Sequence, residues 1–62
     1  MMLNEDTIEK LFVLAEKYAN IKNLDSVEYI NGMIEPMIAS SFDVNALVRK
    51  LISYHEEWIG KF

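Results

Sequence analysis

The last third of the sequence, residues 42–60, repeats its apolar side chains at the spacing of an α-helix. On a wheel of about 100° per residue, one face roughly 160° wide is apolar almost throughout. It is made of Val44, Leu47, Val48, Leu51, Ile52, Tyr54, His55, Trp58 and Ile59. His55, the only histidine of the chain, interrupts this face. A stripe this wide has to be covered by other helices, so the sequence predicts a helix at about 43–59 within an all-α fold.

Two earlier stretches carry the same kind of start signal followed by the same apolar spacing. Asn4 is a suitable N-cap, and the stripe that follows predicts a helix at about 5–21, with Asn23 in the turn after it. Asp25 has Glu28 three residues later, which is the spacing of a capping box. Asp43 is placed in the same way before the last helix, and Gly60 is a candidate C-terminal cap.

The second stretch contains two helix breakers, and their positions decide how it is interpreted. Gly32 and Pro36 are four residues apart and fall on the polar side of the wheel, while the apolar phase continues through both. The sequence therefore predicts one helix at about 26–39, kinked at these two positions, with the interrupted carbonyl facing water. Two short helices that meet near Glu35 are the alternative.

The fold class that follows is all-α, a small three-helix bundle in one domain spanning residues 1–62. The chain has no cysteine, so neither a disulfide nor a thiolate metal site stabilises it. Apolar residues make up 52% of the chain, a large share for a core this small. This surplus favours self-association as a homodimer, or a tight complex with another protein, over a self-sufficient monomer.

Charge and composition limit the classes of partner. The formal net charge of −4 disfavours non-specific binding to nucleic acid or to an anionic membrane. The chain has no apolar run of the ~20 residues that a transmembrane helix needs, and its start lacks a basic signal-peptide region. We expect no membrane association and a cytoplasmic location.

Catalytic chemistry is not indicated. The helical neighbours of His55 are Leu51, Ile52, Trp58 and Ile59, none of which is a carboxylate, a nucleophile or a second metal ligand. The two glycines stand apart, so the chain has no phosphate-binding loop. Bundles this small seldom enclose the ~300 Å³ typical of ligand pockets. We therefore expect no enzyme activity, cofactor, metal or small-molecule substrate.

The main hypothesis is a small helical protein that acts by protein–protein interaction, as a regulator, inhibitor or antitoxin-like antagonist. Met33 and Met37 are interpreted as gap-filling core residues. The candidate interface combines residues at the edges and in the middle of the apolar face of the last helix with apolar residues that lie off the predicted stripes. These are Tyr54, Trp58, Ile52, Ile59, His55, Tyr29, Val13 and Ile21. The sequence leaves the identity of the partner open.

A DNA-binding regulator is the alternative hypothesis. Residues 35–54 look like a helix-turn-helix pattern, with Ile38-Ala39 late in the first helix and Phe42 and Val44 around the turn. The polar face of the second helix would then contact DNA through Asn45, Arg49, Lys50 and Ser53. Asp43 at the usual glycine position, and Arg49 at a core position, depart from the pattern.

Overall fold

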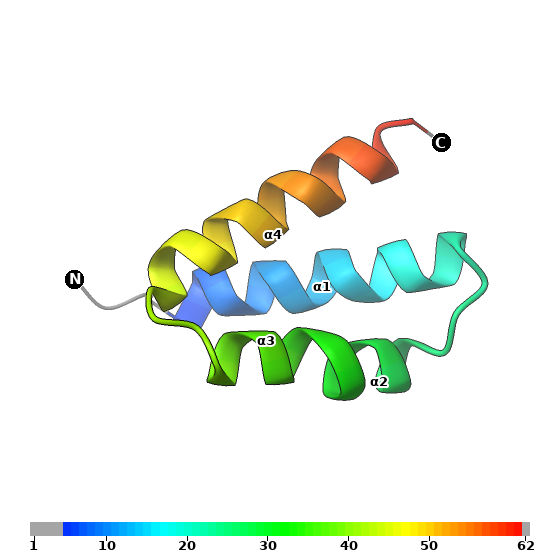
Figure 1. Ribbon diagram of the computed structural model, residues 1–62. Coiled ribbons are helices and arrows are strands. Elements are labelled where there is room, and N and C mark those ends of the chain that lie inside the picture. The colour runs from blue at the N-terminus through cyan, green and yellow to red at the C-terminus, as the bar shows by residue number, and fades with distance from the viewer. Residues whose placement is uncertain (1–4, 62) are drawn as a thin grey trace.

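The computed structural model describes residues 5–61, and these form an all-α fold of three helical segments (Figure 1). The first is α1 (Glu5–Ile21) and the last is α4 (Val44–Ile59). Between them, α2 (Ser26–Tyr29), η1 (Ile30–Ile34) and α3 (Glu35–Ala39) follow one another without a gap. The predicted fold class and the three helical ranges are confirmed, whereas the predicted cap at Asn4 lies outside the described residues.

The predicted N-caps form for the second and last helices. The carboxylate Oδ1 of Asp25 accepts hydrogen bonds from the backbone N–H groups of Val27 and Glu28, at 2.9 and 3.1 Å. Asp43 Oδ1 accepts one from the N–H of Ala46 at 3.0 Å. Each carboxylate satisfies donors that the first turn of a helix leaves free. Gly60 differs from the prediction, because its φ of −64° is helical and makes no use of a glycine's freedom.

The turn after α1 is a Schellman motif centred on Asn23. Asn23 has a φ of 61°, in the left-handed region. The N–H of Leu24 donates to the carbonyl of Ala19 at 2.8 Å, and the N–H of Asn23 donates to that of Asn20 at 3.2 Å. These two bonds are the ones that define the motif. Asn tolerates this conformation better than most residues, which is why the sequence identified it as the turn residue.

Asn23→Ala is expected to lower the free energy of unfolding by about 1 kcal/mol. The left-handed conformation is unfavourable for a residue with a Cβ, and alanine lacks the side-chain amide that offsets this cost in asparagine. Asn23→Gly, the matched control, should leave the stability unchanged or raise it. Urea denaturation followed by circular dichroism measures both variants. Equal losses in the two variants would show that the backbone conformation is not the cause.

The second helix continues past its proline through a π-helical turn, which the sequence did not predict. The N–H of Glu35 donates to the carbonyl of Ile30, five residues earlier. A proline ring normally clashes with the carbonyl four residues before it, here that of Gly32. The wider turn comes directly before Pro36, which lies in the first turn of α3, where no N–H is needed. Gly32 and Pro36 are both exposed, as predicted.

The three helices do not form a closed bundle in which each contacts both others along its length. Helix α1 packs against α4 on one side and against α2 and η1 on the other. Helix α4 approaches the second helical segment only at α3 and diverges from it toward the opposite end (Figure 1). The core follows α1 and consists of Leu11, Ala15, Ala19, Ile34, Val48, Leu51 and Ile52. The divergence leaves a groove between α4 and the second helical segment.

Candidate functional site

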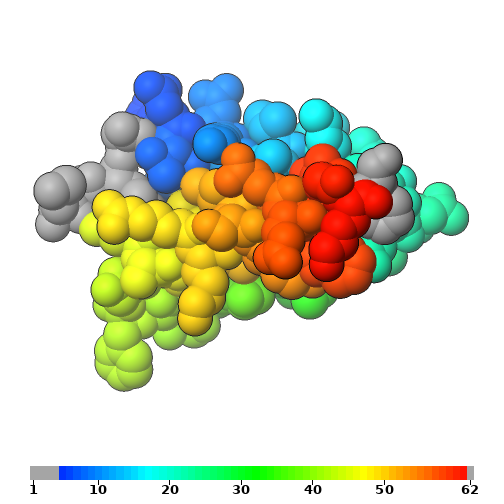
Figure 2. Space-filling model, turned by 90° about the horizontal axis from the view of Figure 1, so that it is seen from above, coloured from blue at the N-terminus to red at the C-terminus, as the bar shows by residue number. Residues whose placement is uncertain are grey.

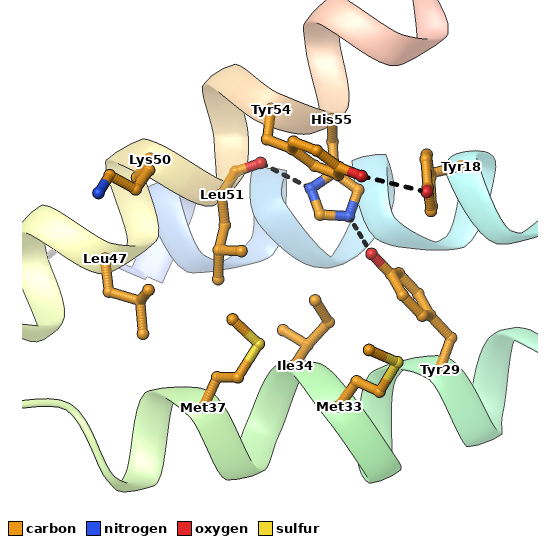
Figure 3. A pocket seen from close by; sticks show the side chains of 10 residues that line it. All are labelled: Tyr18, Tyr29, Met33, Ile34, Met37, Leu47, Lys50, Leu51, Tyr54 and His55. Carbon is orange, nitrogen blue, oxygen red and sulfur yellow. Dashed lines mark hydrogen bonds between the residues drawn. The ribbon is translucent and has the colours of Figure 1, made fainter.

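An apolar groove of about 360 Å³ lies where α4 diverges from the second helical segment. In Figure 3, α4 forms the upper wall, α2, η1 and α3 form the lower wall, and α1 lies behind. The lining residues are Tyr18, Tyr29, Met33, Ile34, Met37, Leu47, Lys50, Leu51, Tyr54 and His55. From the sequence, a bundle of this size is expected seldom to enclose ~300 Å³; the groove reaches that volume, but it is open to solvent on one side.

Exposed apolar side chains form the edges of the groove. Met33 and Met37 are 56% and 40% exposed on the lower wall, and Tyr54 is 43% exposed on the upper wall. Ile34 and Leu51 are buried at the base between them. The interpretation of the two methionines as core residues is wrong, because no third wall covers the face on which they lie.

His55 lines the groove but is fully buried, and both of its ring nitrogens have hydrogen-bond partners. Nδ1 lies 2.6 Å from the carbonyl oxygen of Leu51, and Nε2 lies 2.6 Å from the hydroxyl of Tyr29 (Figure 3). Because a carbonyl only accepts, Nδ1 carries the hydrogen, and in the neutral ring Nε2 accepts from the tyrosine. Neither nitrogen is left to act as a base or as a metal ligand.

The bond between Tyr29 and His55 also joins two elements whose backbones do not approach each other. Tyr29 is in α2 and His55 is in α4, and the close backbone contacts of α4 are with α1 and α3. The side-chain bridge therefore spans the width of the groove at its open end. This pair is therefore a direct side-chain contact between the two walls.

Tyr18 is the centre of an aromatic cluster behind the bridge. Its ring centroid lies 4.9 Å from that of His55, 5.4 Å from that of Tyr29 and 5.9 Å from that of Tyr54. The ring of His55 meets it edge-on, a favourable geometry for aromatic pairs. The hydroxyl oxygens of Tyr18 and Tyr54 are 3.4 Å apart. The polar atoms of the cluster are thus largely paired with one another.

Trp58 extends the cluster toward the end of α4, where two lysines lie against it. Its ring centroid is 6.5 Å from that of Tyr18. The ammonium groups of Lys22 and Lys61 lie 4.2 and 5.0 Å from the ring centroid of Trp58, within range of a cation–π interaction. Lys22 comes from the turn after α1, so these contacts tie that turn to α4.

The cluster perturbs two tyrosine hydroxyls. Burial raises the pKa of Tyr29 from 10.0 to about 12, with smaller contributions from the charges that Tyr18 and Tyr54 would carry. The pKa of Tyr54 is also raised, first by its hydrogen bond with Tyr18. In both cases the neutral hydroxyl is the favoured form.

Above pH 10 the protein is expected to lose stability through Tyr29. Its folded pKa of about 12 lies above the unfolded value of 10.0, so this contribution is complete below pH 10 and is lost as the pH rises through 12. The melting temperature of the wild type should therefore fall more between these limits than that of Tyr29→Phe. Ultraviolet absorbance of the ionised phenols gives a direct check, and titration of all three tyrosines together near pH 10 would contradict the prediction.

The structure divides the predicted interface residues among three locations. Tyr29, Tyr54 and His55 line the groove, and Trp58 lies beside them in the aromatic cluster. Ile52 is buried in the core and Ile59 is half-buried. Val13 and Ile21 line a separate shallow depression on α1. The eight residues therefore do not form one surface.

The predicted DNA-contact residues lie on α4, but the helix-turn-helix pattern is incomplete. Arg49, Lys50 and Ser53 are exposed and Asn45 is half-buried. Of these, Lys50 lines the groove. The pattern requires Phe42 to be buried beside the turn, whereas Phe42 is fully exposed. DNA binding stays a prediction that the packing at Phe42 does not favour.

Several groove residues were missed as candidates, chiefly Tyr18, Met33, Met37 and Leu47. One signal was available in the sequence. Tyr29, Met33 and Met37 follow one another at intervals of four residues, and this row adds to the stripe of isoleucines at positions 30, 34 and 38. When an apolar stripe is wider than one neighbouring helix can cover, part of the stripe stays exposed.

Among residues 5–61, no three histidine or acidic side chains are close enough to hold a metal ion. None of the described helices has both the length and the apolar character needed to cross a membrane. Comparison of the chain with known protein families, with curated proteins and with solved structures finds no match.

Proposed function

We propose that the protein is a non-enzymatic helical module that binds another polypeptide in the groove between α4 and the second helical segment. The observation that carries this proposal is the groove itself, which has exposed apolar edges at Met33, Met37 and Tyr54 above a buried apolar base. Contiguous apolar surface of this kind is typical of interaction sites. A regulator, inhibitor or antitoxin-like antagonist acts by occupying the surface of a partner protein, and this groove would provide the contact.

The chemistry of the lining favours apolar side chains over a polar ligand. Methionine is flexible and polarisable, and it recurs in grooves that accept the apolar face of a helix. The hydroxyl and imidazole groups that line the groove already pair with each other, as Tyr29 does with His55 and Tyr18 with Tyr54. A polypeptide segment that presents one or two large apolar residues satisfies this lining, and it requires few new hydrogen bonds.

The environment of His55 supports a non-enzymatic role. Its two nitrogens bond to Tyr29 and Leu51, and the side chain has no exposed surface. A general base needs a free nitrogen within reach of a substrate proton. The contribution of His55 here is to hold the two walls of the groove together.

A peptide library displayed on phage tests the proposal. The wild type, Met37→Glu and Val27→Glu are immobilised and panned in parallel, since both substituted side chains are exposed and neither change should unfold the protein. We expect the wild type to enrich peptides with large apolar residues at helical spacing. These peptides should lose binding to Met37→Glu and keep it with Val27→Glu, because Val27 lies outside the groove.

Two outcomes would contradict the proposal. One is the absence of enriched peptides on the wild type, and the other is enrichment of peptides whose affinity is the same for all three proteins. Circular dichroism spectra of the three proteins should coincide, which shows that a loss of binding reflects the groove and not the fold.

A further inference from the structure

Phe42 is the most exposed large apolar residue among those described. It lies in the connection between α3 and α4, and its side chain is fully accessible to solvent. An isolated exposed leucine or valine is ordinary, but a phenylalanine with no covered surface is costly to leave in water. In Figure 2 the connection between α3 and α4, coloured yellow-green, projects from the lower left edge of the molecule.

The groove opens on the same side as this projection. Figure 3 shows α4 above, the second helical segment below and α1 behind, so the groove faces the reader there, and Figure 1 draws these helices in the same arrangement. The side that faces the reader in Figure 1 is the lower side in Figure 2, which is where the connection projects. The connection that carries Phe42 therefore projects on the side of the protein on which the groove opens.

The groove has room for an aromatic ring. A cavity of about 150 Å³ lined by apolar side chains accommodates benzene, and this groove has about 360 Å³. The part nearest α3 is lined by Met37 and Leu47, both apolar, and methionine sulfur makes favourable contacts with aromatic rings. A phenylalanine side chain fits this lining in both size and chemistry.

Charge complementarity points to the same occupant. Of the ten lining residues, Lys50 alone carries a formal charge. The residue after Phe42 is Asp43, which is also exposed. A Phe-Asp pair that enters the groove with its ring therefore brings a carboxylate toward the lysine at the edge. The chain itself has this pair beside its own groove.

We propose that the occupant of the groove is Phe42 of a second copy of this chain, in a reciprocal two-fold dimer. This inference rests on the proposed function, because it names the polypeptide that the groove binds. A two-fold axis through the face that holds both features lets each copy insert its Phe42 into the other, with Asp43 of each copy near Lys50 of its partner. Such an isologous contact closes on itself and does not propagate into filaments.

The affinity is expected to be modest. Each phenylalanine buries about 150–250 Å², so two insertions alone supply less than the roughly 1,200–2,000 Å² of a standard stable interface. The methionines and Tyr54 at the groove edges add to this area. We expect a dimer that dissociates in the micromolar range.

Sedimentation equilibrium over low-micromolar to near-millimolar concentrations tests the dimer. The wild type should pass from monomer to dimer, and Phe42→Ser should raise the dissociation constant by about 100-fold or more, since each dimer loses two buried aromatic anchors. Met37→Glu should have a similar effect from the groove side. Val27→Ser, an exposed apolar residue outside the groove, is the matched control and should dimerise like the wild type.

A mixing experiment tests the reciprocal geometry. Phe42→Ser retains its groove, and Met37→Glu retains its Phe42, so the two variants together restore one of the two insertions. We expect a heterodimer when one of them carries a fluorescent label and the other is in excess, although neither variant dimerises alone. Failure of the mixture to associate, or association equal to that of the wild type, would overturn the reciprocal arrangement.

The inference and the proposed function fail in distinguishable ways. A wild type that stays monomeric, that dimerises unaffected by Phe42→Ser, or that forms higher polymers overturns the inference. If Phe42→Ser nevertheless enriches groove-dependent peptides from the library, the proposed function stands with a different partner. If the wild type is monomeric and no peptide is enriched, both fail.

Discussion

Replacing His55 by alanine is expected to unfold the protein at room temperature. The side chain is fully buried, so its removal leaves a cavity and deprives Tyr29 and the carbonyl of Leu51 of a hydrogen-bond partner. Removing a large buried side chain costs about 3–5 kcal/mol in general, and the lost hydrogen bonds add about 1–3 kcal/mol. A core in a domain this small rarely supplies more than about 3–5 kcal/mol in total. Circular dichroism and urea denaturation measure the loss, and a variant that still unfolds cooperatively with the midpoint of the wild type would contradict the prediction.

A double-mutant cycle separates the hydrogen bond from the packing. Tyr29→Phe leaves the buried Nε2 of His55 without its partner, which we expect to cost about 1–3 kcal/mol. His55→Leu keeps most of the volume and removes the need for that partner. Adding Tyr29→Phe to His55→Leu should therefore cost far less than adding it to the wild type. Additive losses would mean that the 2.6 Å bond between these residues contributes nothing to stability.

Ile34→Ala is the second substitution with a large expected effect. Ile34 is 1% exposed, belongs to the core cluster with Leu11 and Val48, and also forms part of the base of the groove. Truncating a buried isoleucine to alanine costs about 2–5 kcal/mol, through lost burial and the cavity that remains. We expect a loss of this size in the free energy of unfolding, measured by urea denaturation.

Ile21→Ala is the matched control for Ile34→Ala. The chemistry of the substitution is the same and both residues are in helices, but Ile21 is 39% exposed at the end of α1. The free energy of unfolding that Ile21→Ala loses should be well under half of the loss in Ile34→Ala. Similar losses for the two variants would show that the base of the groove is no better packed than the outer surface of α1.

The helices were predictable because local signals determine where each begins and ends. Asp25 and Asp43 each precede an apolar stripe and each accept the hydrogen bonds of the first turn. Asn23 adopts the left-handed conformation that its side chain tolerates. Caps, turns and periodicity involve residues within a few positions of one another, so they can be inferred before the tertiary contacts are known.

The groove was not predictable from the same signals. Periodicity identifies which face of a helix is apolar, but it does not state whether a second helix covers that face. Met33 and Met37 satisfy the pattern of a core helix, and they are exposed because α4 diverges from the second helical segment. The exposure of Phe42 was not predictable for the same reason, since the sequence shows an apolar residue beside the turn but not whether another element covers it.

The hydrogen-bond partners of His55 could not be predicted from the sequence either. The side chains of its neighbours along α4 offer no bonding partner, and only the backbone carbonyl of Leu51 does. The hydroxyl that bonds to Nε2 comes from Tyr29, 26 residues earlier in the chain. The sequence did identify both residues as candidates, because one is a polar residue on an apolar stripe and the other is an aromatic residue off its stripe. Their contact depends on how α2 and α4 are placed around α1.

The π-helical turn at Ile30–Ile34 has a consequence for the register of the groove wall. A turn closed by a five-residue bond holds one residue more than an α-helical turn, so it acts as a one-residue insertion within a helix. Each residue of an α-helix advances the direction of the side chains by about 100°. Tyr29 precedes the turn and Met37 follows it, so the offset brings these two groove-lining side chains closer to one direction than an uninterrupted α-helix would. The lower wall is thus two short helical faces brought into alignment by a single extra residue, and the upper wall on α4 is one continuous face.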